Sequence, residues 1–323
     1  MVPLKKKSNL LKNCGLILGS ASVIVMIYNR LINIIANSKD HLPIENGKFY
    51  PWRYGKIYYT KTGFGSPILL IHDLDSSSSS YEWDKVINRL SKKNTVYAID
   101  LLGCGRSEKP ILTYTNFLYV QLINDFIKHV IKARTTVIAT GSSFSFSLMA
   151  SQMEPKYFSK LIGVSPMEIT EMAKLPTRKY RLYHDLFNIP LIGNLIYNIA
   201  MSKNGILDKM TKDDYYKDYL IPDKTLLSYY HGAHQDNGKG RFLYASIAGR
   251  YTNINIAPAL KKTDASIHLI GGKEMDSIDF IMDEYTSLNP SIEVAYIPKA
   301  KKLPQLETPE RFVKLVEIIL NTK

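Results

Sequence analysis

A serine within a run of small residues is the first candidate for chemistry in this chain. Residues 136–140 are apolar or β-branched, and they lead into Gly-Ser-Ser-Phe-Ser at 141–145 and then into a helical pattern. A serine on a sharp strand-to-helix turn needs little side-chain bulk two residues before and after it. Gly141 and Ser145 meet that need, so the spacing predicts Ser143 as a nucleophile. The alternative is an ordinary turn whose serines satisfy backbone groups.

Further apolar stretches predict the sheet that positions this turn. One strand at 66–71 runs into His72 and Asp73, and another at 95–99 runs into a glycine-containing turn that ends at Pro110. A third strand, at 267–270, enters a turn at Gly271, and the chain closes with an amphipathic helix. Short apolar strands that alternate with helical segments predict a mainly parallel sheet with helices on both faces.

Taken in order, these stretches resemble the α/β-hydrolase superfamily, in the branch of proline iminopeptidases, esterases and carbon–carbon bond hydrolases. The resemblance covers about residues 49–320 and is closest in the turns at 100–110 and 303–309. It implies an α/β-hydrolase core at residues 41–166 and 265–323 and a helical cap at 167–264. It also implies serine chemistry that needs no metal and no other cofactor.

The resemblance assigns an acid and a base to positions late in the chain. Three residues after Gly271 stands Glu274, the candidate acid, with Asp276 as the alternative if the turn is longer. The base, normally a histidine in the pattern A-G-H-x-P, falls on Lys302. The histidine of the triad is therefore replaced by lysine.

A lysine at the base position changes the expected mechanism. Its ordinary pKa is about 10.4, and lowering it to 7 costs about 4.6 kcal/mol. A neighbouring carboxylate acts in the opposite direction, because it stabilises the ammonium form. We therefore expect Lys302 to form an ion pair with Glu274 and to be a poor general base. His234, in the cap, is the best substitute base among the remaining histidines.

The resemblance also locates the oxyanion hole, in the backbone amides of Leu74 and Phe144. His72, just before it, is expected to be a structural hydrogen-bonding residue. Asp73 stands where the family often has glycine, and a carboxylate there repels a developing oxyanion unless it points away. Aromatic residues crowd the cap and predict either a pocket for an acyl group or packing of the cap on the sheet.

The N-terminal segment has the pattern of a membrane anchor. Four lysines (Lys5, Lys6, Lys7 and Lys12) precede the apolar run 14–28, and a second apolar patch follows Arg30. Residues 1–40 are therefore expected to form an uncleaved single span with the lysines inside the cell and the large domain outside. An amphipathic surface helix and a cleavable signal peptide, cut near residues 36–38, are the alternatives.

Composition limits the possible partners. The net charge is +13, of which residues 1–40 contribute +5, and no basic recognition helix or aromatic-basic platform accompanies it. Nucleic acid is therefore not an expected partner. The only cysteines, Cys14 and Cys104, lie in the anchor and in a turn, which predicts no disulfide.

Two functions follow from these observations. The first is a membrane-anchored serine hydrolase acting on carboxylic esters or related small acyl compounds, with a degenerate triad. The second is a catalytically impaired pseudo-hydrolase that binds a ligand or a protein. The sequence does not fix the oligomeric state.

Overall fold

The computed structural model describes residues 4–44 and 47–322. The side chains of residues 4–15, 17 and 18, which include Lys5, Lys6, Lys7, Lys12 and Cys14, lie outside the description.

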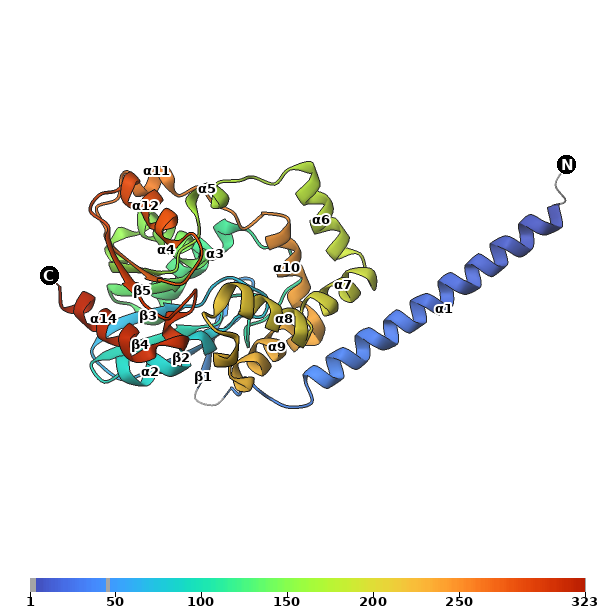
Figure 1. Ribbon diagram of the computed structural model, residues 1–323, viewed down its shortest axis with the longest axis horizontal. Helices are drawn as coiled ribbons and strands as arrows, with labels where there is room; N and C mark the ends of the chain where they lie inside the picture. The colour runs from blue at the N-terminus through green and yellow to red at the C-terminus, as the bar shows by residue number, and fades with distance from the viewer. Residues whose placement is uncertain (1–3, 45–46, 323) are drawn as a thin grey trace.

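An eight-stranded sheet forms the centre of the domain (Figure 1). Its strands are β1 (Gly47–Trp52), β2 (Gly55–Thr62), β3 (Ser66–Ile71), β4 (Asn94–Ile99), β5 (Thr135–Thr140), β6 (Phe158–Val164), β7 (Ser266–Gly272) and β8 (Glu293–Ile297). The spatial order is β1-β2-β4-β3-β5-β6-β7-β8. Strands β3 to β8 pair in parallel, whereas β2 is antiparallel to both of its neighbours. The predicted mainly parallel sheet is confirmed.

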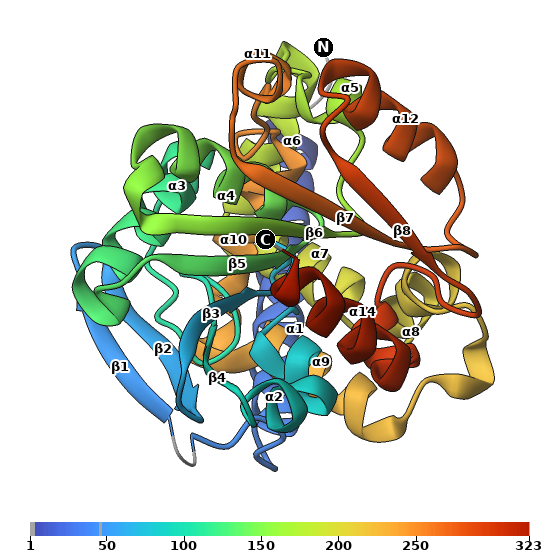
Figure 2. The same ribbon diagram turned by 90° about the vertical axis from the view of Figure 1, so that its left-hand side faces the viewer.

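Helices cover both faces of this sheet, as Figure 2 shows. On one face lie α2 (Asp84–Leu90) and α14 (Pro309–Asn321), whose Val86 and Phe312 are fully buried against the strands. On the other lie α3 (Asn116–Phe126), α4 (Ser142–Met153) and α12 (Ile278–Leu288). All residues of β5 are buried, as expected for a central strand covered on both sides.

The segment between β6 and β7 forms a mostly helical insertion at one end of the domain. It contains α5 (Ile169–Met172), α6 (Arg178–Asn188), α7 (Ile192–Ala200), α8 (Lys203–Lys209), α9 (Asp223–Gly238), α10 (Gly240–Ala248) and α11 (Ala257–Leu260). Four of its tyrosines share one buried cluster with Leu306 of the short helix α13 (Pro304–Glu307): Tyr197, Tyr215, Tyr229 and Tyr230. These aromatic residues therefore pack the insertion together and do not line an open acyl pocket.

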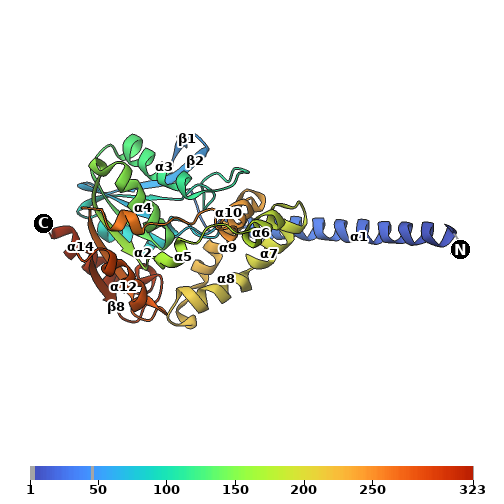
Figure 3. The same cartoon turned by 90° about the horizontal axis from the view of Figure 1, so that it is seen from above.

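A single long helix, α1 (Leu4–Ala36), leaves the domain beside this insertion (Figures 1 and 3). Within it, Gly19–Ala36 is long and apolar enough to cross a membrane, and only 11% of that window is buried. A membrane span and a signal sequence both have this composition.

Candidate functional site

The sharp turn between β5 and α4 is made by Gly141. Its backbone has φ 56° and ψ −127°, a combination that glycine adopts far more easily than any other residue. A nucleophile elbow holds its serine on the strained residue of this turn. The structure therefore puts the nucleophile position of the elbow on Gly141, which has no side chain.

Ser143, the predicted nucleophile, lies two residues further on, in the first turn of α4. It is fully buried, and its Oγ donates a hydrogen bond of 2.6 Å to the carbonyl of His72. The predicted and observed positions of the elbow differ by two residues because small residues flank two different positions in this segment with the same spacing. Gly141 and Ser145 flank Ser143, and Ala139 and Ser143 flank Gly141 in the same way.

The space above Gly141 is filled by the side chain of Asp73. A Cβ atom placed on Gly141 would lie 2.4 Å from Oδ1 of Asp73, a distance that real Cβ atoms do not tolerate. Asp73 follows β3 directly, so the loop after that strand carries its carboxylate to the turn after β5. A serine at position 141 and the present position of Asp73 are mutually exclusive.

The same carboxylate oxygen accepts the hydrogen bonds that an oxyanion hole would offer. Oδ1 of Asp73 accepts from the backbone amides of Leu74, at 2.8 Å, and Ser142, at 2.9 Å, and from the hydroxyl of Ser142 at 2.8 Å. The amide of Leu74, which the family resemblance assigned to the oxyanion hole, is one of these donors. The second donor is Ser142, because the amide of Phe144 donates to the carbonyl of Gly141 inside the turn.

Lys302 forms an ion pair with Asp73 and not with Glu274, which corrects the pairing expected from the sequence. Its Nζ lies 2.7 Å from Oδ2 of Asp73 and 4.0 Å from Oδ1 of Asp214, and only 15% of its side chain is exposed. Asp73 and Asp214 raise the pKa of Lys302 against the effect of burial. The lysine is therefore a stable ammonium group and not a general base.

Glu274 and Asp276 lie after β7, as predicted, but have other surroundings than this pair. Glu274 accepts a hydrogen bond of 3.3 Å from the backbone amide of Lys299, and Asp276 is exposed. Within the described residues, neither carboxylate forms an ion pair with Lys302.

Further charged groups, some partly exposed and some buried, extend the Asp73–Lys302 pair. Lys209 of α8 pairs with Asp75 at 3.0 Å, next to Asp214. Glu82 accepts a hydrogen bond of 3.2 Å from the amide of Asp73, and its burial raises its pKa to about 8, so it is mostly protonated at neutral pH. Charges in a dry interior are tolerated when they are paired or neutralised in this way.

The cavity inside this cluster has a volume of about 10 Å³. It is lined by Asp73, Ser78, Glu82, Lys209, Asp214, Tyr229, Lys302 and Leu303. A single water molecule needs roughly 10–15 Å³ measured in this way. The site therefore has no room for an acyl substrate in this conformation.

The candidate histidines have other roles. His72 Nε2 accepts a hydrogen bond of 2.9 Å from the amide of Leu101, its Nδ1 contacts the carbonyl of Asp73 at 2.7 Å, and burial lowers its pKa. His234 stacks near Tyr230 and Tyr197 within the insertion, and it does not line the cavity described above. No group of histidine, cysteine, aspartate and glutamate in the described part of the chain has the arrangement of a metal site.

Sequence reasoning found Asp73 and Lys302 separately but missed their pairing. The signal was present, since the two departures from the family pattern carry opposite charges. Asp214 and Lys209 belong to the insertion, where no motif marks them, and only the fold brings them to the site.

Comparisons with known proteins agree with this architecture. The sequence profile described as "Alpha/beta hydrolase family" matches residues 68–315. Curated relatives match over shorter stretches. One is a 2-hydroxy-6-oxo-6-(2'-aminophenyl)hexa-2,4-dienoic acid hydrolase of Metapseudomonas resinovorans, which is 37% identical to this chain. That match covers 22% of this chain and 24% of the relative. An uncharacterized protein of Mycobacterium tuberculosis is 30% identical over 34% of this chain. The match spans only 31% of that relative.

Solved structures match over almost their full length. Carboxylesterase CesB of Bacillus subtilis covers 92% of this chain and 98% of its own, with a TM-score of 0.64 and 17% identity. A serine hydrolase involved in carbazole degradation covers 86% and 99%, with a TM-score of 0.68 and 16% identity. At these identities the likeness establishes the fold alone.

Proposed function

This chain belongs to the alpha/beta hydrolase family, and from that premise we propose that it is a membrane-anchored pseudo-hydrolase: it keeps the fold, has closed the reaction site, and serves as a binding module. The observation that carries the proposal is the position of the Asp73 carboxylate. This carboxylate occupies the space that a nucleophile at position 141 would need, and it accepts hydrogen bonds from the backbone amides of both Leu74 and Ser142.

Serine hydrolysis needs three groups that this site does not bring together. The strained residue of the elbow, Gly141, has no hydroxyl, and Ser143 directs its own hydroxyl at a backbone carbonyl. The base position holds Lys302, whose ammonium is stabilised by Asp73. The oxyanion donors are already used by a negative charge, so a tetrahedral intermediate gains no stabilisation from them.

The bound partner therefore meets the outer surface of the domain and not the family's substrate cavity. The large apolar window in α1 supports a role at a membrane, with the domain held on its outer face. Nucleic acid is not among the proposed partners, and no cofactor enters the proposal.

A working serine hydrolase is the second candidate, because relatives named as hydrolases match parts of this chain. In that case Ser143 would attack a small carboxylic ester, Glu274 would be the acid, and either Lys302 or His234 would be the base. This function requires Ser143 Oγ to leave the His72 carbonyl and Asp73 to leave the oxyanion donors.

Labelling with a fluorophosphonate probe separates the two candidates, because the probe reacts only with an activated serine. We expect no labelling of the wild-type chain. We expect labelling to appear in the triple variant Asp73→Gly, Gly141→Ser, Lys302→His, which opens the oxyanion donors and supplies a nucleophile and a base with a pKa near 6.5.

The matched control is Lys302→His alone, which restores the base without a nucleophile at position 141 and should remain unlabelled. Wild-type labelling that is lost in Ser143→Ala would refute the pseudo-hydrolase and establish the serine hydrolase.

A further inference from the structure

We propose that the hairpin of α6 and α7 (residues 178–200) is a membrane-docking surface that lies at the headgroup–acyl boundary of the same bilayer that α1 spans. The inference rests on the anchoring role of α1 in the proposed function. It concerns a different part of the molecule from the closed reaction site.

The first argument is the depth at which α1 contacts this hairpin. Asn29 is buried and lies inside the candidate span Gly19–Ala36. Its Nδ2 donates to the carbonyl of Leu191 at 3.2 Å, and its Oδ1 accepts from Asn198 at 2.8 Å. Asn29 precedes Ala36 by seven residues, which at 1.5 Å per residue is about 10 Å along the helix. When the span is in the membrane, the part of the hairpin that contacts Asn29 therefore lies about 10 Å inside the outer end of the span, near the headgroup–acyl boundary.

These hydrogen bonds also explain why an asparagine is present in the span. A polar side chain in hydrocarbon is costly unless it is hydrogen-bonded. The hairpin supplies both partners, which supports the two elements meeting inside the membrane boundary.

The second argument is the chemistry of the exposed face. Apolar side chains are exposed along the hairpin: Ile189 and Ile192 (49% exposed) at its tip, Leu182 on α6 and Ile199 (57% exposed) near the end of α7. Three basic residues at the start of α6 are exposed too: Arg178, Lys179 and Arg181. Apolar residues flanked by lysine and arginine are typical of helices that insert 5–10 Å into the headgroup boundary, about the depth estimated above.

The third argument is geometric. In Figures 1 and 3, α6 and α7 lie at the end of the domain toward which α1 projects, and α14 lies at the opposite end. A bilayer crossed by α1 therefore faces the hairpin and not α14.

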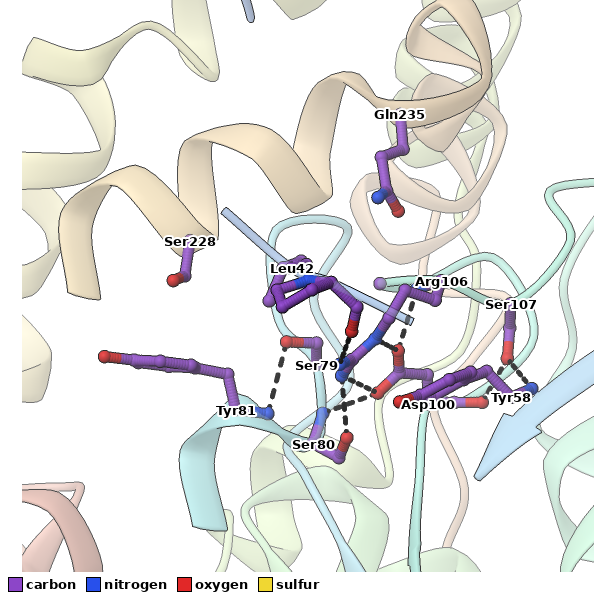
Figure 4. Close-up of polar contacts among 12 residues, drawn as sticks. Leu42, Tyr58, Ser79, Ser80, Tyr81, Asp100, Arg106, Ser107, Ser228 and Gln235 are labelled. Atoms are coloured by element: carbon purple, nitrogen blue, oxygen red, sulfur yellow. Dashed lines mark hydrogen bonds and ion pairs between the residues drawn. The ribbon is translucent and has the colours of Figure 1, made fainter. Parts of the chain in front are cut away.

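The linker after α1 fixes this orientation. Asn37 donates to the carbonyl of His234 at 3.0 Å, and the amide of His41 donates to His231 at 2.8 Å. Figure 4 shows the next residues held between α9 and the Asp100–Arg106 ion pair, with Leu42 buried and Arg106 donating to the carbonyl of Pro43. The domain is thus fastened to its anchor and does not swing freely from it.

The test uses the full-length chain in vesicles of phosphatidylcholine with one third phosphatidylglycerol. In a Cys14→Ser background, an NBD fluorophore is placed at Ile192→Cys, and the matched control is Ile318→Cys, which is exposed on α14. Nitroxide lipids should quench the probe at 192 at least twofold more strongly than the probe at 318. Equal quenching at the two positions overturns the docking surface.

Resistance to alkaline extraction is measured on the same samples. A chain that stays in the bilayer but shows an unquenched probe at 192 refutes docking and leaves the anchor intact. A chain released by alkali refutes both the anchor and docking. Fluorophosphonate labelling reports on the reaction site independently of either result.

Discussion

Replacing Lys302 by methionine tests whether the ion pair between Lys302 and Asp73 stabilises the fold. The substitution keeps an unbranched side chain of similar length but removes the charge that lies 2.7 Å from Asp73. Breaking a buried ion pair by removing one partner costs about 3–5 kcal/mol. Asp73 keeps its three hydrogen bonds from Leu74 and Ser142, so we expect the lower end, about 3 kcal/mol.

For a domain of this size, 1 kcal/mol corresponds to a shift of about 2 °C in Tm, so Lys302→Met should lower Tm by roughly 6 °C. Thermal unfolding followed by circular dichroism measures this shift, and urea unfolding gives the free energy. Adding Asp73→Asn should recover part of the loss, because it removes the charge left unpaired.

The pH dependence provides a second check on Lys302→Met. Lys302 and the hydrogen bonds lower the pKa of Asp73 below 3.8, so its contribution to stability is present above pH 3.8 and is lost as the pH falls through the folded-state pKa. The difference in free energy of unfolding between the wild type and Lys302→Met should therefore become smaller at acidic pH. Lys273→Met, which breaks an exposed pair with Asp279, is the control and should have little effect. A Lys302→Met variant as stable as this control would refute the reasoning.

The other predictions concern Glu82 and the anchor. Burial raises the pKa of Glu82 from 4.5 to about 8, so the wild type should lose stability as the pH rises between these values. Glu82→Gln should remove that loss, which urea unfolding at pH 5 and pH 9 measures. A Glu82→Gln variant that is no more stable than the wild type at pH 9 would contradict this prediction. Protease added to intact cells should digest the large domain, because the lysines at the start of α1 stay inside; a domain that survives until the membrane is broken shows the opposite orientation.

The sheet could be predicted from the sequence because each strand is marked by a short run of apolar residues and by the turn residues next to it. The strands that end near His72, Asp100 and Gly271 all lie where their apolar runs predicted. The assignment of Leu74 to an oxyanion hole came instead from the family resemblance, and in the structure the amide of Leu74 donates to Asp73.

The site itself could not be predicted fully, because two of its features are not local. The register of the elbow depends on one pair of backbone angles at Gly141, and small residues flank both Gly141 and Ser143 with equal spacing. The spacing from Gly271 predicts Glu274 as the partner of Lys302, whereas in the fold the loop after β3 brings Asp73 to within 2.7 Å of it.

The carboxylate of Asp73 has a consequence for any molecule designed to enter this site. An external anion would compete with a carboxylate that belongs to the same chain and already accepts hydrogen bonds from the amides of Leu74 and Ser142. A ligand that enters this site must therefore first displace Asp73, so a screen for ligands should be directed at the outer surface of the domain.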